Sequence, residues 1–561
     1  MAQTPNMPRS SLPRPSARIS VTAGVSLALL VAAAVVAVYG STVDYPLSYD
    51  DYHQVRPYTF AEVAASFGGN WDVTAIEKPF YRPLTVAFYA LRFDLLGVNE
   101  RAYRILSLLM LASAGTLLGW AVLALSGRTG TACAAAVLFA VHPAVPYSLA
   151  SWATNQMHLL AMLLFLTGLL IWVLAPAGRS WPWVALIAVQ VLLFLVKEDG
   201  IMFAPVLLLL HGTRALSTSG RWAWPPLPAL TVLLGLVVVL PLWRYVALGQ
   251  LGGYGAPSVQ QAWTNLLAGP RAVLFQIPAK RPGQLVFAWL FNGIVATGLI
   301  TAALTRRTSS LLLFAGGATV LVLFDLPFAF AVKAEQLHFI ALGATVLFAA
   351  GVTALADVSV HRVVGWTALG LGAVACGTAA LVAANIAADF APCAPRTLYT
   401  NGIVRGWASV PAEITMGLPS TPATCSPGAR RRLTTLPVIT FGAYAWEGEG
   451  DERFRWSGQR LVYFVSQEKA SLTQRMRLRN PSISSTSVSI RIDGRPWRDV
   501  AVSEAWQTIT IPRPGLRGLF GGQSWTIEAI VYDTWIPARH DARSTDRRTL
   551  GIQLGATVDS P

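Results

Sequence analysis

The first long apolar stretch, residues 21–39, reads VTAGVSLALLVAAAVVAVY and contains no charged side chain. It approaches the roughly 20 residues that a helix needs to cross a bilayer. Shortly after it comes Tyr49-Asp50-Asp51-Tyr52-His53, which places two adjacent carboxylates beside the predicted span. The stretch predicts a membrane helix with an acidic pair near its end. Acids at such a place are also ordinary interfacial charges, so the rest of the chain has to decide between the two interpretations.

The residues before this stretch leave two interpretations open. Residues 1–20 are rich in Pro and Ser and carry Arg9, Arg14 and Arg18. Basic residues ahead of an Ala-rich apolar run are also typical of a signal peptide. We favour an uncleaved first span because of its length, with residues 1–20 as a cytoplasmic tail.

The composition is that of a membrane protein. The 561 residues are 54% hydrophobic and only 13% charged, with a mean hydropathy of +0.50. The apolar runs end near residue 390, and the remainder is polar, rich in Arg and patterned at a period of two. We therefore expect a membrane domain over 21–390 and a second domain over 391–561.

Apolar runs long enough to span a bilayer recur along the first domain, and they predict about eleven transmembrane helices. The expected spans are 21–40, 103–125, 131–148, 156–175, 181–196, 200–211, 226–248, 285–304, 310–331, 336–356 and 363–388. Lys197-Glu198-Asp199-Gly200 interrupts the region 181–211. That region is either two short spans that meet at the motif or one kinked element.

Basic residues in the short loops set the orientation. A cytoplasmic N-terminus places on the inner side Arg128, Arg179, Arg214, Arg221, Arg306, Arg307 and Arg362. This agrees with the positive-inside rule and makes the second domain extracytoplasmic, with a bacterial inner membrane as the expected location. The net charge of +15 is spread over loops and tail. We therefore assign it to orientation and contact with the lipid bilayer, and not to nucleic acid.

The same orientation in the membrane places the unusual polar motifs on the outer side. These are Asp50-Asp51, Tyr81-Arg82-Pro83, His142-Pro143, Lys197-Glu198-Asp199, the loop 249–283, and Lys333 with Glu335. The outer loop 41–102 is long for a membrane protein and is therefore a functional candidate. Within it, residues 59–67 predict a short helix. Residues 84–96 predict an interfacial helix with Leu84, Phe88, Leu91 and Leu95 on one side and Arg92 and Asp94 on the other.

The tail predicts an antiparallel β-sandwich. Short alternating segments, separated by Gly, Pro and Asp, cover 461–465, 487–492, 507–511 and 525–532. Cys393 and Cys425 lie outside the spans and are compatible with a disulfide in an oxidising compartment, whereas Cys133 and Cys376 fall within spans as packing residues. Trp497, Trp506, Trp525 and Trp535 are candidates for stacking on sugars, although tryptophans on strands more often form the core. Asp546 with Arg547 and Arg548 indicates a structural ion pair.

Four motifs in order carry a family resemblance: Tyr49-Asp50-Asp51, Tyr81-Arg82-Pro83-Leu84-Thr85, Phe139-Ala140-Val141-His142-Pro143 and Leu195-Val196-Lys197-Glu198-Asp199-Gly200. The chain resembles membrane glycosyltransferases of the GT-C superfamily. The likeness is greatest to the protein O-mannosyltransferases, including those with tetratricopeptide repeats. It covers residues 20–390 in pattern, but no tetratricopeptide repeats follow, so the acceptor is not implied.

The resemblance implies inverting transfer of a sugar from a polyprenyl-phosphate donor to a glycan, lipid or protein acceptor of the cell envelope. It implies an acidic general base after the first span, which is Asp51 or Asp50. The chemistry needs such a group because the attacking hydroxyl loses its proton. Relatives carry an Arg and an acid early in the fourth span, where Gln156 and His158 stand here. No second acid is therefore carried over.

A lipid-phosphate leaving group requires cations where negative charge develops, and Arg82 and Lys197 are the candidates. Pairing of Lys197 with Glu198, or extension to the interface, is the competing interpretation. Further candidates for substrate contacts are His53, Tyr81, His142, Asn155, His158 and Glu198. No compact metal-ligand spacing is present, so we expect no metal or other cofactor. A transporter, or a relative that binds saccharide or lipid without catalysis, remains the alternative function.

Overall fold

The computed structural model describes two compact units, which are treated separately below. The helical unit comprises Met1–Gly40, Leu108–Leu149 and Asn155–Ala387, and the mixed unit comprises Ser41–Ser107, Ala150–Thr154 and Ala388–Pro561. The described residues are 21–44, 54–55, 58–71, 80–97, 100–146, 153–176, 179–219, 222–249, 257–276, 282–305, 308–329, 337–357, 362–389, 438–448, 453–466, 469–492, 495–513, 524–541, 543–544, 546, 548 and 550–558.

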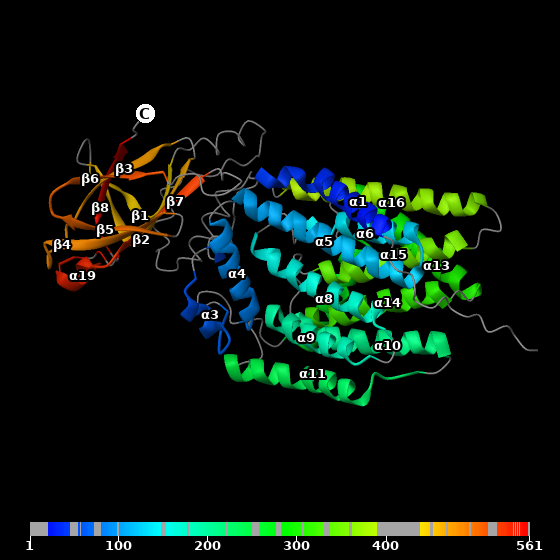
Figure 1. The fold of residues 1–561 in the computed structure, drawn as a ribbon. Helices are drawn as coiled ribbons and strands as arrows, with labels where there is room; N and C mark the ends of the chain where they lie inside the picture. Colours follow the sequence, from blue (N-terminus) through cyan, green and yellow to red (C-terminus); the bar gives the residue numbers. More distant parts are fainter. Residues whose placement is uncertain are drawn as a thin grey trace, which may run out of the picture. The chain divides into compact units, whose positions relative to one another are not determined.

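The helical unit is a bundle of long apolar helices (Figure 1). Among the described residues, eight helices have the length and composition to cross a membrane, and three shorter apolar ones accompany them. All eleven expected spans are present as helices. They are α1 (Val21–Tyr39), α5 (Glu100–Ser126), α6 (Thr129–Val141), α8 (Gln156–Leu174), α9 (Trp181–Val196), α10 (Phe203–Ser219), α11 (Leu227–Leu248), α13 (Pro282–Leu304), α14 (Thr308–Asp325), α15 (His338–Asp357) and α16 (Arg362–Asp389). Short 3-10 turns adjoin them at Gly40–Asp44, Ala153–Asn155, Glu198–Met202 and Leu326–Ala329.

The first span, α1, packs closely against α5 at two glycines one helical turn apart. A Cβ placed on Gly115 would lie 2.9 Å from Cγ1 of Val31, and one on Gly119 would lie 2.5 Å from Cδ2 of Leu27. Small residues at this spacing let membrane helices approach closely, where van der Waals contact drives their association. Leu27 and Val31 are accordingly buried, and α1 is a packed part of the bundle.

One helix escaped sequence prediction. Residues 259–274, inside the expected loop 249–283, form α12 (Val259–Leu274), which begins at the side-chain cap of Ser258. Its apolar residues Val259 and Trp263 are exposed, whereas Asn265 and Gly269 are buried on its inner side. Polar residues between the apolar ones keep its hydropathy low, so α12 lacks the continuous apolar run that marked the spans.

The mixed unit contains the two helices expected in the outer loop. α3 (Phe60–Ser66) starts with a capping box between Thr59 and Glu62, and α4 (Pro83–Leu96) starts at a proline. The structure buries Arg92 of α4, which the sequence did not predict. Arg92 is buried at 2% exposure because it donates to the carbonyl of Ala153 and lies over the Tyr89 ring. Apolar residues on the outer side of α4 are instead exposed, Leu91 at 58% and Leu95 at 73%.

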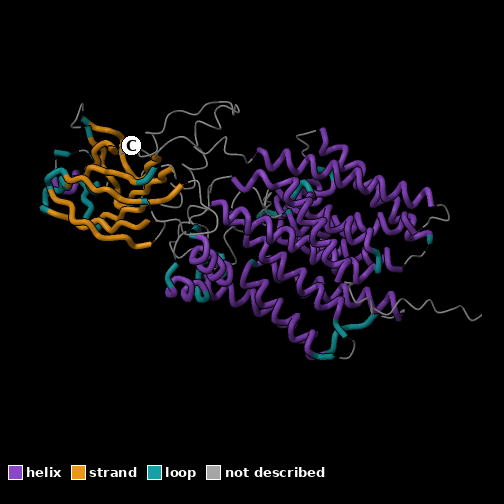
Figure 2. The backbone as a smooth tube through the Cα atoms, turned by 45° about the horizontal axis from the view of Figure 1, so that its top comes forward, coloured by secondary structure: helices purple, strands orange, loops and turns teal. Residues whose placement is uncertain are grey.

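The strands of the C-terminal part are drawn in orange in Figure 2. They form an antiparallel eight-stranded sheet in the order β5-β4-β7-β2-β8-β3-β6, with β1 paired to β2. All four segments that alternation predicted are strands. The strands are β1 (Val438–Glu447), β2 (Phe454–Ser466), β3 (Ser471–Arg477), β4 (Ser485–Ile492), β5 (Arg495–Ser503), β6 (Gln507–Pro512), β7 (Ser524–Val531) and β8 (Gln553–Val558). A short helix, α19 (Pro537–His540), precedes β8.

Two halves of this sheet enclose one core. Val488 of β4 and Trp525 of β7 share a buried cluster with Leu472 of β3, Ile509 of β6 and Leu554 of β8. The two halves therefore face each other, as expected for a sandwich. Trp525 is a fully buried core residue, in agreement with the interpretation of tail tryptophans as core.

The structure describes two of the four cysteines. Cys133 and Cys376 are free thiols within α6 and α16. The proposed pair Cys393 and Cys425 lies outside the described residues. The disulfide therefore stays a prediction.

The ion pair predicted near the C-terminus is present and extends to β1. Arg548 donates to Asp546 at 2.7 Å and to Glu447 at 2.8 Å. The Arg548 side chain holds the pKa of the Asp546 carboxyl below its ordinary value of 3.8. A group with a lowered folded pKa adds stability above its unfolded pKa, and this is lost as the pH falls through the folded value.

We expect Asp546→Asn to lower the unfolding temperature of the C-terminal domain at neutral pH. The difference from wild type should begin to shrink below about pH 4, where Asp546 of the unfolded chain becomes protonated. It should vanish as the pH falls through the lower pKa that Asp546 has in the folded protein. Tryptophan fluorescence during heating at several pH values measures this. Asp499→Asn, at an exposed position on β5, is the matched control and should show no such pH dependence. A difference that is unchanged between neutral and acidic pH would contradict the assignment.

Candidate functional site

The sequence-predicted site residues fall into three groups. Asp50, Asp51 and His53 lie outside the described residues. Tyr81 and Arg82 belong to the mixed unit. The helical unit contains His142, Asn155, His158, Lys197 and Glu198.

One end of the helical unit collects its buried ionisable side chains. This polar end is formed by the C-termini of α6, α9, α11 and α14 and the N-termini of α8, α10 and α15. In the described helical unit, every buried charged or histidine side chain lies here, namely His142, His158, Lys197, Asp325 and His338. Ionisable groups within membrane helices are costly, and they commonly mark functional sites.

The Lys197-Glu198-Asp199-Gly200 motif forms a tight corner between α9 and α10, so two short helices are present and not one kinked element. The amide of Gln190 donates to the Gly200 carbonyl at 3.1 Å, and its oxygen accepts the Ala204 N–H at 2.8 Å. A Cβ on Gly200 would lie 2.5 Å from the carbonyl carbon of Leu193. The corner therefore requires glycine and is braced by Gln190.

Lys197 is held inside this corner by an ion pair with Asp199. Its side chain is 1% exposed, so it does not extend to the surface, and its partner is not the Glu198 that sequence suggested. Within the described chain Asp199 is its only hydrogen-bond partner. An ammonium has three donors, so two of its N–H groups have no protein acceptor there.

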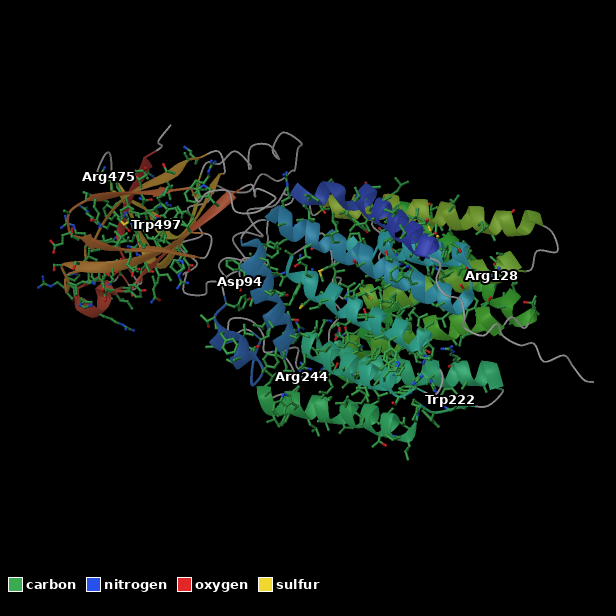
Figure 3. All side chains as sticks on the ribbon, in the orientation of Figure 1. Asp94, Arg128, Trp222, Arg244, Arg475 and Trp497 are labelled. Atoms are coloured by element: carbon green, nitrogen blue, oxygen red, sulfur yellow. The ribbon has the colours of Figure 1, made fainter. Side chains whose placement is uncertain are left out.

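Arg244, near the end of α11, is a cation that sequence analysis missed. Its guanidinium lies 3.5 Å from the Glu198 carboxylate, a long contact, and its buried Nε has no partner among the described residues. Figure 3 shows Arg244 at the opposite end of the bundle from Arg128 and Trp222. The available signal was an arginine near the outer end of the span 226–248, where the positive-inside rule does not call for one.

Three histidines occupy the polar end, one by itself and two as a pair. His142 follows α6 and is fully buried, and its Nδ1 accepts the Ala144 N–H at 3.1 Å. His158 at the start of α8 meets His338 at the start of α15, with ring centroids 4.9 Å apart. Sequence analysis selected His142 and His158 for substrate contacts, and the structure places His338 beside His158.

Aromatic rings lie directly below the histidine pair. Phe165, two turns beyond His158 on α8, contacts Phe203, Phe324 and Phe339 at centroid distances of 5.2–5.7 Å. These rings come from four different helices, α8, α10, α14 and α15. The aromatic layer is therefore an apolar floor to the polar end.

A carboxylate lies beside this layer, at the end of α14. Asp325 is 7% exposed and makes no ion pair or hydrogen bond within the described residues, and its Oδ1 is fully buried. That oxygen lies against Gly269 of α12, where a Cβ would collide with it and with Ile340. Sequence analysis overlooked Asp325 because it ends an apolar run without any neighbouring motif.

In the mixed unit, Tyr81 and Arg82 are fixed just before α4. The Tyr81 hydroxyl donates to the Phe67 carbonyl at 3.0 Å. The Arg82 guanidinium lies 4.1 Å from the centroid of Phe80 and 5.1 Å from that of Trp71. Arg82 is therefore a buried cation supported by aromatic rings. This contact fixes its position while its charge persists.

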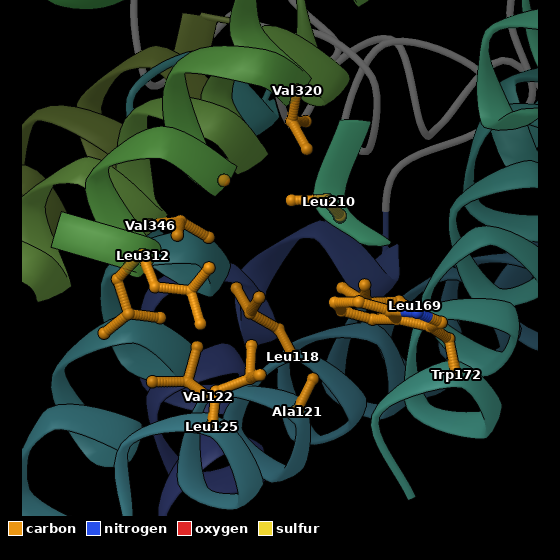
Figure 4. Close-up of a pocket in the computed structure, with 12 residues that line it drawn as sticks. Leu118, Ala121, Val122, Leu125, Leu169, Trp172, Leu210, Leu312, Val320 and Val346 are labelled. Carbon is orange, nitrogen blue, oxygen red and sulfur yellow. The ribbon is translucent and has the colours of Figure 1, made fainter. Parts of the chain in front are cut away.

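The helical unit also contains an apolar cavity of about 480 Å³, including space open to solvent (Figure 4). It lies past the aromatic layer, further along α8, at Leu169 and Trp172. Figure 4 shows its other labelled walls, which are Leu118, Ala121, Val122, Leu125, Leu210, Leu312, Val320 and Val346. It contains no ionisable side chain and so offers no acid or base.

Metal binding finds no support in the described part of the chain. No three His, Cys, Asp or Glu side chains gather there in a way that would hold an ion. Because Asp50, Asp51 and His53 are not among these residues, the expectation of a metal-free site stays a prediction.

No protein-family model and no curated protein matches the chain. Among solved structures, arabinosyltransferase EmbB from Mycobacterium smegmatis is similar, with a TM-score of 0.35 and 11% sequence identity. The match covers 95% of this chain and 64% of that protein. A TM-score at this level does not establish a common fold. On its own structure, the chain is an integral membrane protein with a helical bundle followed by a strand-rich domain.

We expect Asp199→Asn to destabilise the helical unit by about 3 kcal/mol, because it leaves the Lys197 charge buried without a counter-charge. The double variant Lys197→Met with Asp199→Leu should recover most of this loss. Unfolding by detergent titration measures the difference. Glu198→Gln is the control, since its partly exposed pair with Arg244 should contribute less than about 1 kcal/mol. Equal losses for Asp199→Asn and Glu198→Gln would refute the buried pair.

We expect Asp325→Asn to raise the free energy of unfolding by about 1 kcal/mol, because a buried charge without a partner costs stability. Gly269→Ala should do the opposite, since its methyl group would meet the Asp325 carboxylate. The same detergent titration reports both. If Asp325→Asn destabilised the protein, the carboxylate would have a stabilising partner in solution.

Proposed function

We propose that the protein is a membrane glycosyltransferase that moves a sugar from a polyprenyl-phosphate donor to a cell-envelope acceptor. The observation that carries this proposal is the polar end, where a buried Lys, a buried Asp, three buried histidines and Arg244 gather above an aromatic layer. Such groups are retained in an apolar bundle at a cost in stability, which function explains. We place the reaction at the extracytoplasmic face, with the N-terminus cytoplasmic.

The proposed reaction is a direct displacement. The oxygen of an acceptor hydroxyl attacks the anomeric carbon, and the bond from this carbon to the phosphate oxygen breaks. The hydroxyl proton passes to a carboxylate, and the lipid phosphate leaves with the bonding electron pair. Asp51 or Asp50 is the proposed proton acceptor, from the family resemblance and from position after α1.

Negative charge on the departing phosphate requires preorganised cations. Lys197 suits this role, since its ion pair with Asp199 fixes it and leaves N–H groups to donate. Arg244 suits it too, because its contact with Glu198 is long and its Nε has no partner among the described residues. We retain Arg82 as a third phosphate-binding candidate. The candidates for contacts with the sugar hydroxyls are Tyr81, His53, His142, Asn155, His158 and Glu198.

A transporter is the second candidate from a different class, and a binding protein without turnover is a third. Transport through the bundle would call for polar groups along its length. In the described helical unit the buried charges stop at the aromatic layer, and the cavity beyond it is apolar. This arrangement favours a reaction at one surface.

We expect Arg244→Gln to lower sugar transfer by about 100-fold, the scale for losing one donor that stabilises a developing oxyanion. Arg244→Lys should retain part of the activity, because the charge remains without the planar fork. Full-length protein in nanodiscs is supplied with polyprenyl-phosphate hexoses and pentoses, and release of polyprenyl phosphate is measured. Arg128→Gln, an exposed position at the other end, is the matched control.

Asp50→Asn and Asp51→Asn test the base in the same assay, and loss of the base should cost about 100-fold or more. Full activity in both single variants and in the double variant would refute the base assignment. Donor binding without any release would favour a binding protein. Movement of intact donor between the two faces of a liposome, without release, would favour transport.

A further inference from the structure

Two arginines of the β-sandwich share one tryptophan. Arg475 and Arg477 are alternate residues of β3, so their side chains leave the same face of the sheet. Their guanidinium carbons lie 5.0 Å and 4.4 Å from the centroid of the Trp506 ring, just ahead of β6. Two like charges are thus held against a single indole. Trp506 therefore differs from the core residue Trp525.

The sheet beneath fixes this arrangement. β3 lies between β6 and β8, with Arg475 opposite Thr508 and Arg477 opposite Gln553. The Arg477 Nε donates to the Gln553 side chain at 2.7 Å. Residues directly opposite in antiparallel strands project to the same face. Thr508 and Gln553 therefore flank the arginines with hydroxyl and amide groups.

Gly555 of β8 makes room for the indole on this face. A Cβ there would lie 3.1 Å from Cβ of Arg475 and 3.5 Å from Cζ3 of Trp506. The buried amide of Gln474 donates to the carbonyls of Gly555 and Arg475, at 2.7 and 2.8 Å. The Trp506 ring therefore lies across the sheet surface at Gly555, on a backbone that side-chain hydrogen bonds hold in place.

The charge of Arg475 has no counter-charge among the described residues. In the described part of the chain its guanidinium makes no ion pair or hydrogen bond, and its one contact is the Trp506 ring. Arg548, in contrast, is neutralised by Asp546 and Glu447. A half-buried guanidinium beside a second one is repelled by it, and an anion between them relieves this repulsion. Figure 3 labels Arg475 among the side chains of the sandwich.

We propose that Arg475, Arg477 and Trp506 form a binding site for an acidic glycan, one whose sugars carry carboxylate or phosphate groups. The guanidinium forks match the two oxygens of such a group. The indole offers an apolar surface to a sugar ring, and the exposed Thr508 offers a hydrogen bond to one of its hydroxyls. The buried Gln553 instead holds Arg477 in position. The site is independent of the proposed transferase reaction, because every residue in it belongs to the sandwich.

The test uses full-length protein in detergent and immobilised polymers: polygalacturonate for carboxylates, poly(glycerol phosphate) for phosphates, and neutral dextran. We expect wild type to bind at least one acidic polymer at least about tenfold more tightly than dextran, with an affinity that falls as salt rises. The variant Arg475→Gln with Arg477→Gln should lose this preference. Unchanged thermal unfolding verifies that the sandwich of the double variant stays folded. If the double variant does not fold, the single variant Arg475→Gln is tested in its place.

The chain provides a matched control in Arg498→Gln, because Arg498 lies 4.3 Å from the centroid of Trp497 as a single pair on β5. This variant should bind like wild type. The proposal is overturned if wild type binds neither acidic polymer, or if Arg498→Gln loses as much binding as the double variant. It is also overturned if the arginines support binding to phosphatidylglycerol vesicles and not to either polymer, since the partner would then be a membrane.

Discussion

The energetic cost of a charge inside an apolar helix bundle is the constraint on which this structure depends. Lys197 is buried, so its ammonium requires a partner, and Asp199 two residues along provides one. The chain reverses beside this pair at Gly200, and Gln190 forms hydrogen bonds to both sides of the corner. The buried pair and its braced corner thus lie together at the end of α9.

The same cost explains how polar and apolar groups are separated within the helical unit. Buried charges and histidines are confined to the polar end, and the rings around Phe165 divide them from the cavity beyond. Asp325 also lies at the polar end, but unlike Lys197 its buried carboxylate has no partner among the described residues. A group that contributes no stability and yet remains buried is consistent with use in binding or proton transfer.

Elements with a strong periodic signal were predicted well, and contacts between them were not. The spans and four strands matched because apolar length and alternation are local properties. The burial of Arg92 on α4 was not predicted, because its contact with Ala153 joins residues distant in sequence. α12 was missed because amphipathic periodicity lowers its hydropathy. Of the candidate site, sequence motifs selected Lys197 and two histidines, but Arg244, Asp325 and His338 stand outside any motif.

The sequence by itself determined that the chain is a membrane protein, where most helices and strands lie, and that a strand-rich domain follows the helices. These properties follow from local hydropathy and alternation. Only the tertiary structure decided that Lys197 pairs with Asp199 and not Glu198, and that Arg244 reaches the same corner. It also decided that two arginines share the Trp506 ring outside the core. The reason is physical: a charge or a ring acquires its role from the groups within a few ångströms of it, and the fold brings those groups from distant helices and strands.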